Sequence, residues 1–200
     1  MIQIVLIDDH PLAVNGIGAW LSGTGRFAVS GAAGSLAEAR SLLGRLDPPP
    51  QIIILDLSMG QEDGLDFIPV LEEICEARNI PQPGILICSM YEDPFLIQRA
   101  FNAGASAYVS KSADFTEIIS AIDAILAGKK YVNEKYQILD PKIWAALTPR
   151  ESEIVSLLKR SMNNRQIARS LGLNLRTIEN HLAHIYVKTG ATSRQELVEL

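Results

Sequence analysis

The sequence predicts an α/β fold in which helices cover both faces of a five-stranded parallel sheet, followed by a small all-α domain. Short aliphatic runs alternate with amphipathic stretches of helical length over the first 127 residues. These runs are continuous rather than alternating in polarity, which is typical of strands buried on both faces. From residue 147 onward only helical patterns and short turns remain. The length of 200 residues is sufficient for two such domains.

Strands and helices are expected in strict alternation along the first domain. The strands are expected at Ile2–Ile7, Phe27–Gly31, Ile52–Leu55, Ile85–Cys88 and Ala107–Val109. The helices are expected near residues 11–22, 35–46, 64–77, 94–103 and 113–127, where apolar residues recur at helical spacing. A sheet of this kind binds ligands at the carboxyl ends of its strands.

A polar, aperiodic stretch divides the chain. We expect a first domain over residues 1–127, a linker over 128–146 and a second domain over 147–200. Asp140 and Pro141 would end any helix that reaches the linker. The second domain begins with a helix start signal, because Thr148 is a good N-cap, a Pro follows it, and Glu151 completes a capping box.

Charge is distributed unevenly between the two parts. Residues 1–146 hold 10 Lys and Arg against 18 Asp and Glu, a balance of −8, whereas residues 147–200 hold 8 against 5, a balance of +3. A small positive excess on a terminal domain is compatible with nucleic-acid phosphates as partners. It is equally compatible with an ordinary solvated helical surface.

The sequence favours a cytoplasmic protein. Its aliphatic runs, such as Ile52–Leu55, are too short to cross a bilayer. The first apolar stretch has no basic segment before it and meets Asp8 and Asp9 directly after it, which is unlike a secretory signal. Cys75 and Cys88 have no metal-ligand spacing and are expected to be buried small hydrophobic residues.

Polar side chains occur where successive expected strands end. They are Asp8, Asp9, Asp56, Ser89 and Lys111. Crowded carboxylates repel one another, and Mg²⁺ would hold them ionised because it prefers hard oxygen ligands. An ionised carboxylate can attack phosphorus, while an ammonium and a hydroxyl stabilise the transferred group. Each residue alone also fits a cap, a turn or a surface lysine; their order along the strands favours a phosphoryl site.

The first 127 residues resemble the receiver domains of response regulators, which have a flavodoxin-like fold. The matching segments are VLIDDHP at 5–11, IILDLSM at 53–59, DG at 63–64, ICSM at 87–90 and AGASAYVSK at 103–111. The resemblance implies that Asp56 accepts a phosphoryl group from a histidine kinase. It further implies the roles of six other residues: Asp8, Asp9 and the Ser58 carbonyl as magnesium ligands, Ser89 and Lys111 as phosphoryl contacts, and Tyr108 as a switch aromatic.

One position departs from the receiver pattern. Family members usually have Pro after the Met of the third-strand loop, whereas this chain has Gly60. Glycine is more flexible than proline, so we expect a looser loop and a change in phosphoryl lifetime. The chemically active side chains are all retained.

In the second domain, one expected helix presents a polar face. A helix that carries Ile167 and Ala168 is expected to stop at Gly172, and Asn174 can cap the next helix. In that next helix the inward positions are Ile178, Leu182 and Ile185. The opposite face carries Arg176, Asn180, Ala183 and Val187, with Glu179 and His184 beside it. This face could enter a DNA major groove, although an ordinary helical hairpin has the same periodicity.

The second domain resembles the helix-turn-helix domain of the NarL/FixJ (LuxR-type) regulators. The matching segments are LTPRE at 147–151, IARSLGL at 167–173, RTIENHL at 176–182 and IYVKTGA at 185–191. Ser161 stands where the family usually has Gly, and Glu179 where a basic residue is common. The expected DNA contacts are Arg165, Arg176, Thr177, Glu179, Asn180, Ala183, His184 and Lys188. Glu179 can accept from cytosine and Asn180 can pair with adenine, whereas Arg165, Arg176 and Lys188 would contact phosphates.

Several other functions fit these residues less well. A phosphatase with an aspartate nucleophile would need an acid at position 58, which is Ser58, and a dinucleotide site would need a glycine motif directly after the first strand. A sigma-like factor would not explain the first domain. Two functions remain compatible with the sequence. One is a regulator of transcription that is phosphorylated and dimerises on DNA, and the other is a DNA-binding regulator whose first domain only dimerises. In the first of these, phosphorylation of Asp56 would draw Ser89 and Tyr108 inward.

Overall fold

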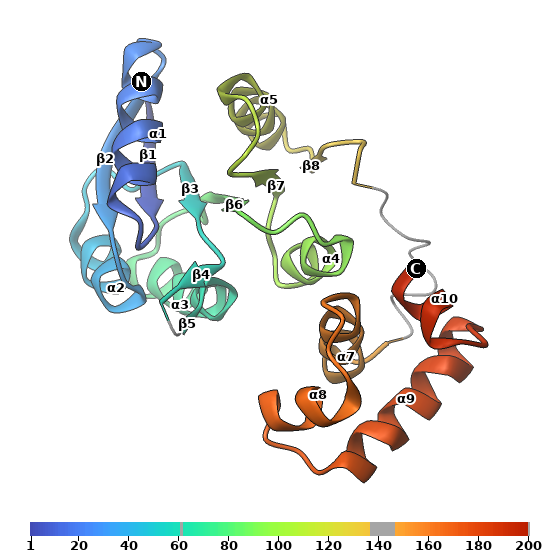
Figure 1. Ribbon diagram of the computed structural model, residues 1–200. Helices are drawn as coiled ribbons and strands as arrows, with labels where there is room; N and C mark the ends of the chain where they lie inside the picture. The colour runs from blue at the N-terminus through green and yellow to red at the C-terminus, as the bar shows by residue number, and fades with distance from the viewer. Residues whose placement is uncertain (61, 137–146, 200) are drawn as a thin grey trace. The chain divides into compact units, whose positions relative to one another are not determined.

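The computed structural model describes residues 1–60, 62–136 and 147–199. The chain divides into two compact units (Figure 1). The first unit is Met1–Glu92 with Ala100–Lys135, and the second is Asp93–Arg99 with Tyr136–Leu200. In the described part of the chain, no helix combines the length and apolar character needed to cross a membrane.

The first unit is built on a parallel sheet with the strand order β2-β1-β3-β6-β7-β8. The strands are β1 Ile2–Ile7, β2 Phe27–Ala33, β3 Ile52–Leu55, β6 Gly84–Ser89, β7 Ala107–Ser110 and β8 Tyr131–Val132. Every residue of β3 and β7 is buried, which explains their unbroken apolar runs.

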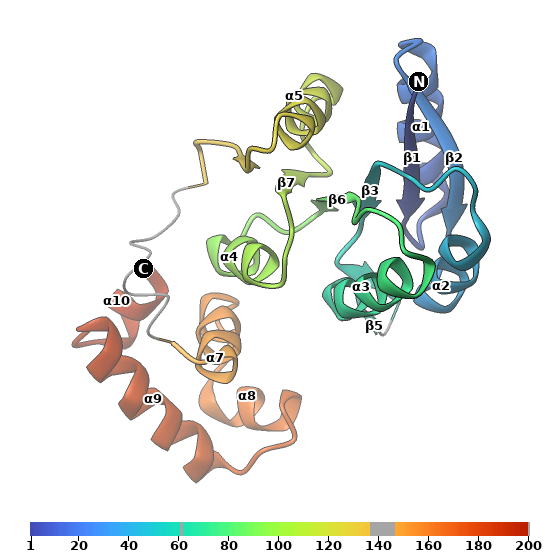
Figure 2. The ribbon, with the colours of Figure 1, turned by 180° about the vertical axis from the view of Figure 1, so that it is seen from behind.

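Helices cover both faces of this sheet. They are α1 Pro11–Gly23, α2 Leu36–Arg45, α3 Phe67–Arg78 and α5 Phe115–Leu126, with the short 3₁₀ helix η1 Gly64–Asp66 before α3. A further helix, α4 Pro94–Asn102, follows β6. Helices α1 and α5 lie on one face and α2 and α3 on the other (Figures 1 and 2). Trp20 of α1 stacks on Phe115 of α5 with ring centroids 4.7 Å apart. The unit division falls within α4, after Arg99.

The five expected strands and five expected helices are confirmed, with small shifts at their ends. The expectation of a five-stranded sheet was wrong, because β8 pairs with β7 as a sixth strand inside the expected linker. A second omission is the short antiparallel pair of β4 Ser58–Met59 and β5 Glu62–Asp63. Two-residue strands carry too little pattern to be read from sequence. Linker residues 137–146 lie outside the described residues.

The second unit contains the expected helices of the C-terminal region. They are α7 Pro149–Lys159, α8 Asn164–Ser170, α9 Leu175–Thr189 and α10 Arg194–Glu199. The capping box at Thr148 and Glu151 is confirmed, and the Asn174 side chain caps α9 as expected. The helices pack on a core that includes the fully buried Ile154 and Ile185.

Both cysteines are free and buried, as the sequence predicted. Burial raises the pKa of the Cys88 thiol to about 12. A thiol with such a pKa carries almost no thiolate at neutral pH and is chemically inert.

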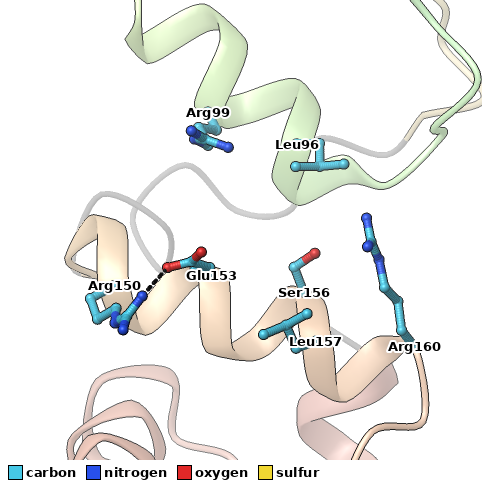
Figure 3. A pocket seen from close by; sticks show the side chains of 7 residues that line it. All are labelled: Leu96, Arg99, Arg150, Glu153, Ser156, Leu157 and Arg160. Atoms are coloured by element: carbon cyan, nitrogen blue, oxygen red, sulfur yellow. Dashed lines mark hydrogen bonds and ion pairs between the residues drawn. The ribbon is translucent and has the colours of Figure 1, made fainter. Parts of the chain in front are cut away.

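The second unit also contains a pocket with several guanidinium groups (Figure 3). Its lining residues are Leu96, Arg99, Arg150, Glu153, Ser156, Leu157 and Arg160. Arg150 pairs with Glu153 at 2.7 Å and donates to the Leu171 carbonyl at 2.8 Å. These contacts tie α7 to the end of α8, so the Arg150 side chain serves the fold of the unit.

Candidate functional site: an acidic pocket and an exposed helix face

The parallel register of the sheet brings the acidic residues together. Asp8 and Asp9 follow β1, and Asp56 follows β3. The Asp56 N–H donates to the Ile7 carbonyl at 2.9 Å, which fixes Asp56 beside the end of β1. Both Asp8 and Asp56 are buried, at 8% and 3% exposure. Burying two carboxylates is costly unless a cation pairs with them.

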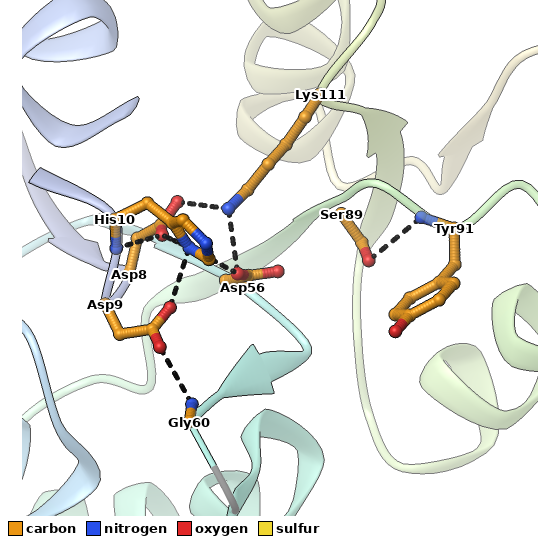
Figure 4. A network of polar contacts seen from close by, with 8 residues as sticks. All are labelled: Asp8, Asp9, His10, Asp56, Gly60, Ser89, Tyr91 and Lys111. Atoms are coloured by element: carbon orange, nitrogen blue, oxygen red, sulfur yellow. Dashed lines mark hydrogen bonds and ion pairs between the residues drawn. The ribbon is translucent and has the colours of Figure 1, made fainter. Parts of the chain in front are cut away.

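Lys111 supplies that cation. Its Nζ lies 2.6 Å from Asp8 Oδ2 and 2.8 Å from Asp56 Oδ2 (Figure 4). Burial alone would lower the pKa of Lys111, but the hydrogen bonds to Asp56 and Asp8 outweigh it and raise the pKa above its ordinary value. The side chain is therefore an ammonium throughout the physiological range. The expected grouping of these three residues is confirmed.

Asp9 completes the pocket from the open side. Its Oδ2 accepts a hydrogen bond of 2.9 Å from the Gly60 N–H. Its Oδ1 is buried and accepts no hydrogen bond, although His10 Nδ1 is 2.8 Å away. His10 lies within the segment VLIDDHP, but this pattern alone does not indicate a role for the histidine. The signal available was its position, directly after two aspartates at a strand end.

Gly60 has a specific role that the sequence interpretation missed. It closes the turn after β4 with a φ of 66°, a left-handed conformation that glycine adopts without strain. Proline cannot adopt this φ and has no N–H to donate to Asp9. Gly60 thus contributes a backbone conformation and an N–H that proline could not supply, whereas the expected loosening of the loop stays a prediction.

The donor set fits a divalent cation. Asp8, Asp9, His10 and Asp56 each offer one ligand atom, and these atoms all lie within 4.8 Å of one another. The unbonded Asp9 oxygen is an available ligand in this group. Carboxylate oxygens are the ligands that Mg²⁺ prefers. Ser58, whose carbonyl was an expected ligand, lies on β4 and lines the pocket around Asp56.

Ser89 lies across the pocket from Asp9, and both Ser89 and Tyr108 contact the backbone of Tyr91. Ser89 is fully buried, and its Oγ accepts a hydrogen bond of 3.3 Å from the Tyr91 N–H (Figure 4). Tyr108 is also fully buried, and its hydroxyl donates to the Tyr91 carbonyl at 2.7 Å. The ring of Tyr108 therefore lies inside the fold in this structure, and its role as a switch aromatic stays a prediction.

The outer face of α9 is free of core contacts, as the sequence predicted. Ile178, Leu182 and Ile185 are buried on the inner side. The exposed positions are Arg176, Glu179, Asn180, Ala183, His184 and Val187. Arg165, on α8, is exposed as well. This surface combines hydrogen-bonding, cationic and small apolar groups, the types that read base edges and contact phosphates.

Two expected DNA contacts are engaged within the second unit. The Thr177 hydroxyl donates to Asn174 Oδ1 at 2.9 Å and forms part of the α9 cap. Lys188 Nζ lies 2.6 Å from Glu151 Oε2. The carboxylate of Glu151 also accepts from the Thr148 N–H at 2.7 Å. Lys188 therefore ties α9 to the first turn of α7.

Both parts of the chain match described protein families. Residues 4–123 match the response regulator receiver domain, and residues 145–200 match the bacterial regulatory proteins of the luxR family. The chain belongs to the response regulators. This response regulator combines a receiver with a LuxR-type DNA-binding domain and is a transcription regulator.

Relatives are similar over nearly the whole chain. The transcriptional regulatory protein MctR of Rhizobium johnstonii is 30% identical over 98% of this response regulator and 91% of its own length. LiaR of Bacillus subtilis is 28% identical over 98% and 94%. The structure of RcsB from Salmonella enterica serovar Typhimurium, bound to promoter rprA in the presence of phosphomimetic BeF3-, is 26% identical with a TM-score of 0.65. That match covers 100% of this chain and 97% of the RcsB chain.

Proposed function

We propose that Asp56 accepts a phosphoryl group from a histidine kinase and that this modification promotes a DNA-binding homodimer. The arrangement of Lys111 across Asp8 and Asp56 carries the proposal, with Nζ 2.6 and 2.8 Å from their oxygens. Lys111 neutralises a carboxylate that would otherwise be a buried anion, and it stands where a phosphoryl oxygen would arrive. The receiver would catalyse only its own phosphorylation and dephosphorylation.

The chain's own residues account for the steps of transfer. An Asp56 oxygen attacks phosphorus, a phosphorus–oxygen bond forms, and the bond to the kinase histidine breaks. Lys111 neutralises the added negative charge, and the Ser89 hydroxyl would turn from Tyr91 to donate to a phosphoryl oxygen. Asp8, Asp9, Asp56 and the Ser58 carbonyl would hold Mg²⁺, which screens charge on the phosphoryl oxygens.

Exposed apolar side chains beside the pocket support a protein donor. The pocket around Asp56 is lined by His10, Leu12, Ala13, Asp56, Ser58, Met90, Tyr91 and Lys111. Leu12 is 89% exposed and Met90 is 70% exposed. Apolar side chains of this size at the surface favour protein–protein contact, here with the kinase. We place this exchange in the cytoplasm.

The DNA-binding part of the proposal uses the outer face of α9. Asn180 and Glu179 would read adenine and cytosine, and Ala183, His184 and Thr177 would lie beside the bases. Arg176 and Arg165 would contact phosphates, as would Lys188 if its ammonium leaves Glu151. The second domain has a small positive excess, so two linked copies would supply affinity that one lacks. The proposal also includes the domain bounds: residues 1–127 are the receiver, 128–146 the linker and 147–200 the DNA-binding domain.

One experiment tests the proposal against a receiver that only dimerises. The full chain is treated with Mg²⁺ and either a small phosphodonor or beryllofluoride, and its mass, oligomeric state and DNA affinity are measured. We expect one phosphoryl adduct from the phosphodonor, a shift to dimer and tighter DNA binding. Asp56→Asn should show none of these. Modification without any change in DNA binding or oligomeric state would contradict the proposal.

A further inference from the structure

His10 points its imidazole into the acidic pocket rather than away from it (Figure 4). Its Nδ1 lies 2.8 Å from Asp9 Oδ1, 3.2 Å from Asp8 Oδ1 and 3.9 Å from Asp56 Oδ2. One ring nitrogen thus faces all three carboxylates. The His10 side chain as a whole is 66% exposed, so the ring covers the pocket from the solvent side. Nothing in the phosphoryl chemistry above uses this ring.

The spacing of these atoms is that of ligands around one octahedral ion. Bonds of about 2.1 Å place neighbouring ligand atoms about 3 Å apart and opposite ones about 4.2 Å apart. The separations from Nδ1 to Asp9 and Asp8 match neighbouring ligands. The separation from Nδ1 to Asp56, at 3.9 Å, approaches that of opposite ligands.

The contact of His10 with Asp9 lacks the geometry of a hydrogen bond. Asp9 Oδ1 is buried and accepts no hydrogen bond, although the ring nitrogen is 2.8 Å away. A cation bound to both atoms would satisfy both lone pairs. The ring also has a contact of 3.2 Å with Asp8 Oδ1 that does meet hydrogen-bond criteria, so an ordinary hydrogen bond is the alternative to be tested.

We propose that His10 is a nitrogen ligand of the divalent cation in this pocket and shifts its preference from Mg²⁺ towards a transition metal such as Mn²⁺. The reason is chemical, because Mg²⁺ strongly prefers oxygen ligands whereas transition metals bind imidazole well. The inference rests on the proposed function, since it concerns the same cation site. It adds a ligand and a metal preference to that site.

Pulsed electron paramagnetic resonance of the full chain loaded with Mn²⁺ tests the ligand directly. We expect the coupling of a directly bound imidazole ¹⁴N in the wild type and its loss in His10→Ala. His184→Ala, which removes an exposed histidine on α9, should keep the coupling. Asp9→Asn should weaken Mn²⁺ binding, which ties the signal to this pocket.

Metal affinities give the second readout. His10→Ala should weaken Mn²⁺ binding about tenfold or more and Mg²⁺ binding less than about threefold. An all-oxygen Mn²⁺ site in the wild type, a ¹⁴N coupling that survives His10→Ala, or equal weakening for both metals would overturn the inference. A different result would contradict the proposed function, namely that the wild type with Mg²⁺ and a phosphodonor gives no adduct on Asp56.

Discussion

At the residue scale, backbone dihedrals explain both positions where the chain departs from family glycine or proline. Gly60 needs its positive φ and its N–H, since it closes a turn and binds Asp9. Ser161 shows the opposite case. It follows α7 with a φ of 60° in the left-handed region, where a side chain is strained. A family glycine at this position would be relaxed, so Ser161 reduces the stability of the second unit.

Ser161→Gly should therefore stabilise the second unit. The left-handed conformation costs a residue with a Cβ about 1–2 kcal/mol, and glycine loses part of this gain to its greater freedom when unfolded. We expect a net gain of about 0.5–1 kcal/mol. By calorimetry of the full chain, the transition of the second unit should move up by about 2–8 °C.

A matched control uses another exposed serine of the same unit. Ser170 is the last residue of α8, where the backbone is helical and glycine is unfavourable. Ser170→Gly should lower the transition temperature. If both variants lowered it, strain at Ser161 would be the wrong explanation.

The site residues differ in how far sequence could predict them. The sequence could predict the grouping of Asp8, Asp56 and Lys111. Parallel strands have their carboxyl ends at one edge of the sheet, so residues there lie close together whichever rotamers they adopt. The roles of His10 and Gly60 were not predictable, because they depend on a ring orientation and on the sign of one φ. The complete burial of Tyr108 was not predictable either, because it depends on how the ring packs in three dimensions.

At the element scale, the start of α7 is a charged junction as well as a cap. Glu151 is 3% exposed, forms the capping box with Thr148, and pairs with Lys188 of α9. Burial alone would raise the pKa of Glu151. Hydrogen bonds from Lys188 and Thr148 outweigh burial and hold the pKa below its ordinary value. The capping box was predictable from local spacing, whereas the long-range partner was not.

This junction should make the second unit sensitive to acid. The pKa of Glu151 is lower in the folded protein than in the unfolded chain. The ionised side chain therefore stabilises the folded second unit fully when the pH is above the pKa of the unfolded chain, about 4.3. The contribution is lost as pH falls through the folded pKa. Glu151→Gln should cost about 1–3 kcal/mol at neutral pH. Calorimetry from neutral pH to below pH 4 should show wild type and variant converging in acid.

Glu153→Gln is the control for this prediction. Glu153 is half exposed and pairs with Arg150 at the surface, where an ion pair contributes little. Its transition temperature should therefore follow the wild type at every pH. Parallel pH profiles for wild type and Glu151→Gln would rule out the depressed pKa as the source of acid sensitivity.

Strand β8 shows where element prediction from sequence ends. Tyr131 and Val132 pair with Ala107 and Tyr108, yet the segment around them is polar and aperiodic. Only two residues join the ladder, and the position is determined by contacts with distant residues. Among these are the hydrogen bonds from the Tyr131 N–H to the Ser106 carbonyl and from Asn133 to Glu117.

At the scale of the whole molecule, the charge balance of the two parts leads us to expect that DNA affinity depends on how many copies bind. Residues 1–146 carry a balance of −8 and residues 147–200 one of +3. On the proposed function, each bound copy would supply few phosphate contacts, so a second copy would add affinity that one domain lacks. The number of copies on the DNA should therefore be readable from the salt dependence of binding.

The variant Arg176→Ala should show how many copies bind to the DNA. Arg176 is exposed at the start of α9, and removing one phosphate contact lowers the slope of log K against log salt by about 0.9. A bound dimer loses two contacts, so beryllofluoride-treated protein should show a slope reduced by about 1.8 and a single bound copy by about 0.9. The loss of affinity should be uniform across DNA sequences, as expected for a phosphate contact.

The control is Arg40→Ala, on α2 of the receiver, which should leave the slope unchanged. An unchanged slope in Arg176→Ala would mean that the start of α9 does not face the phosphate backbone.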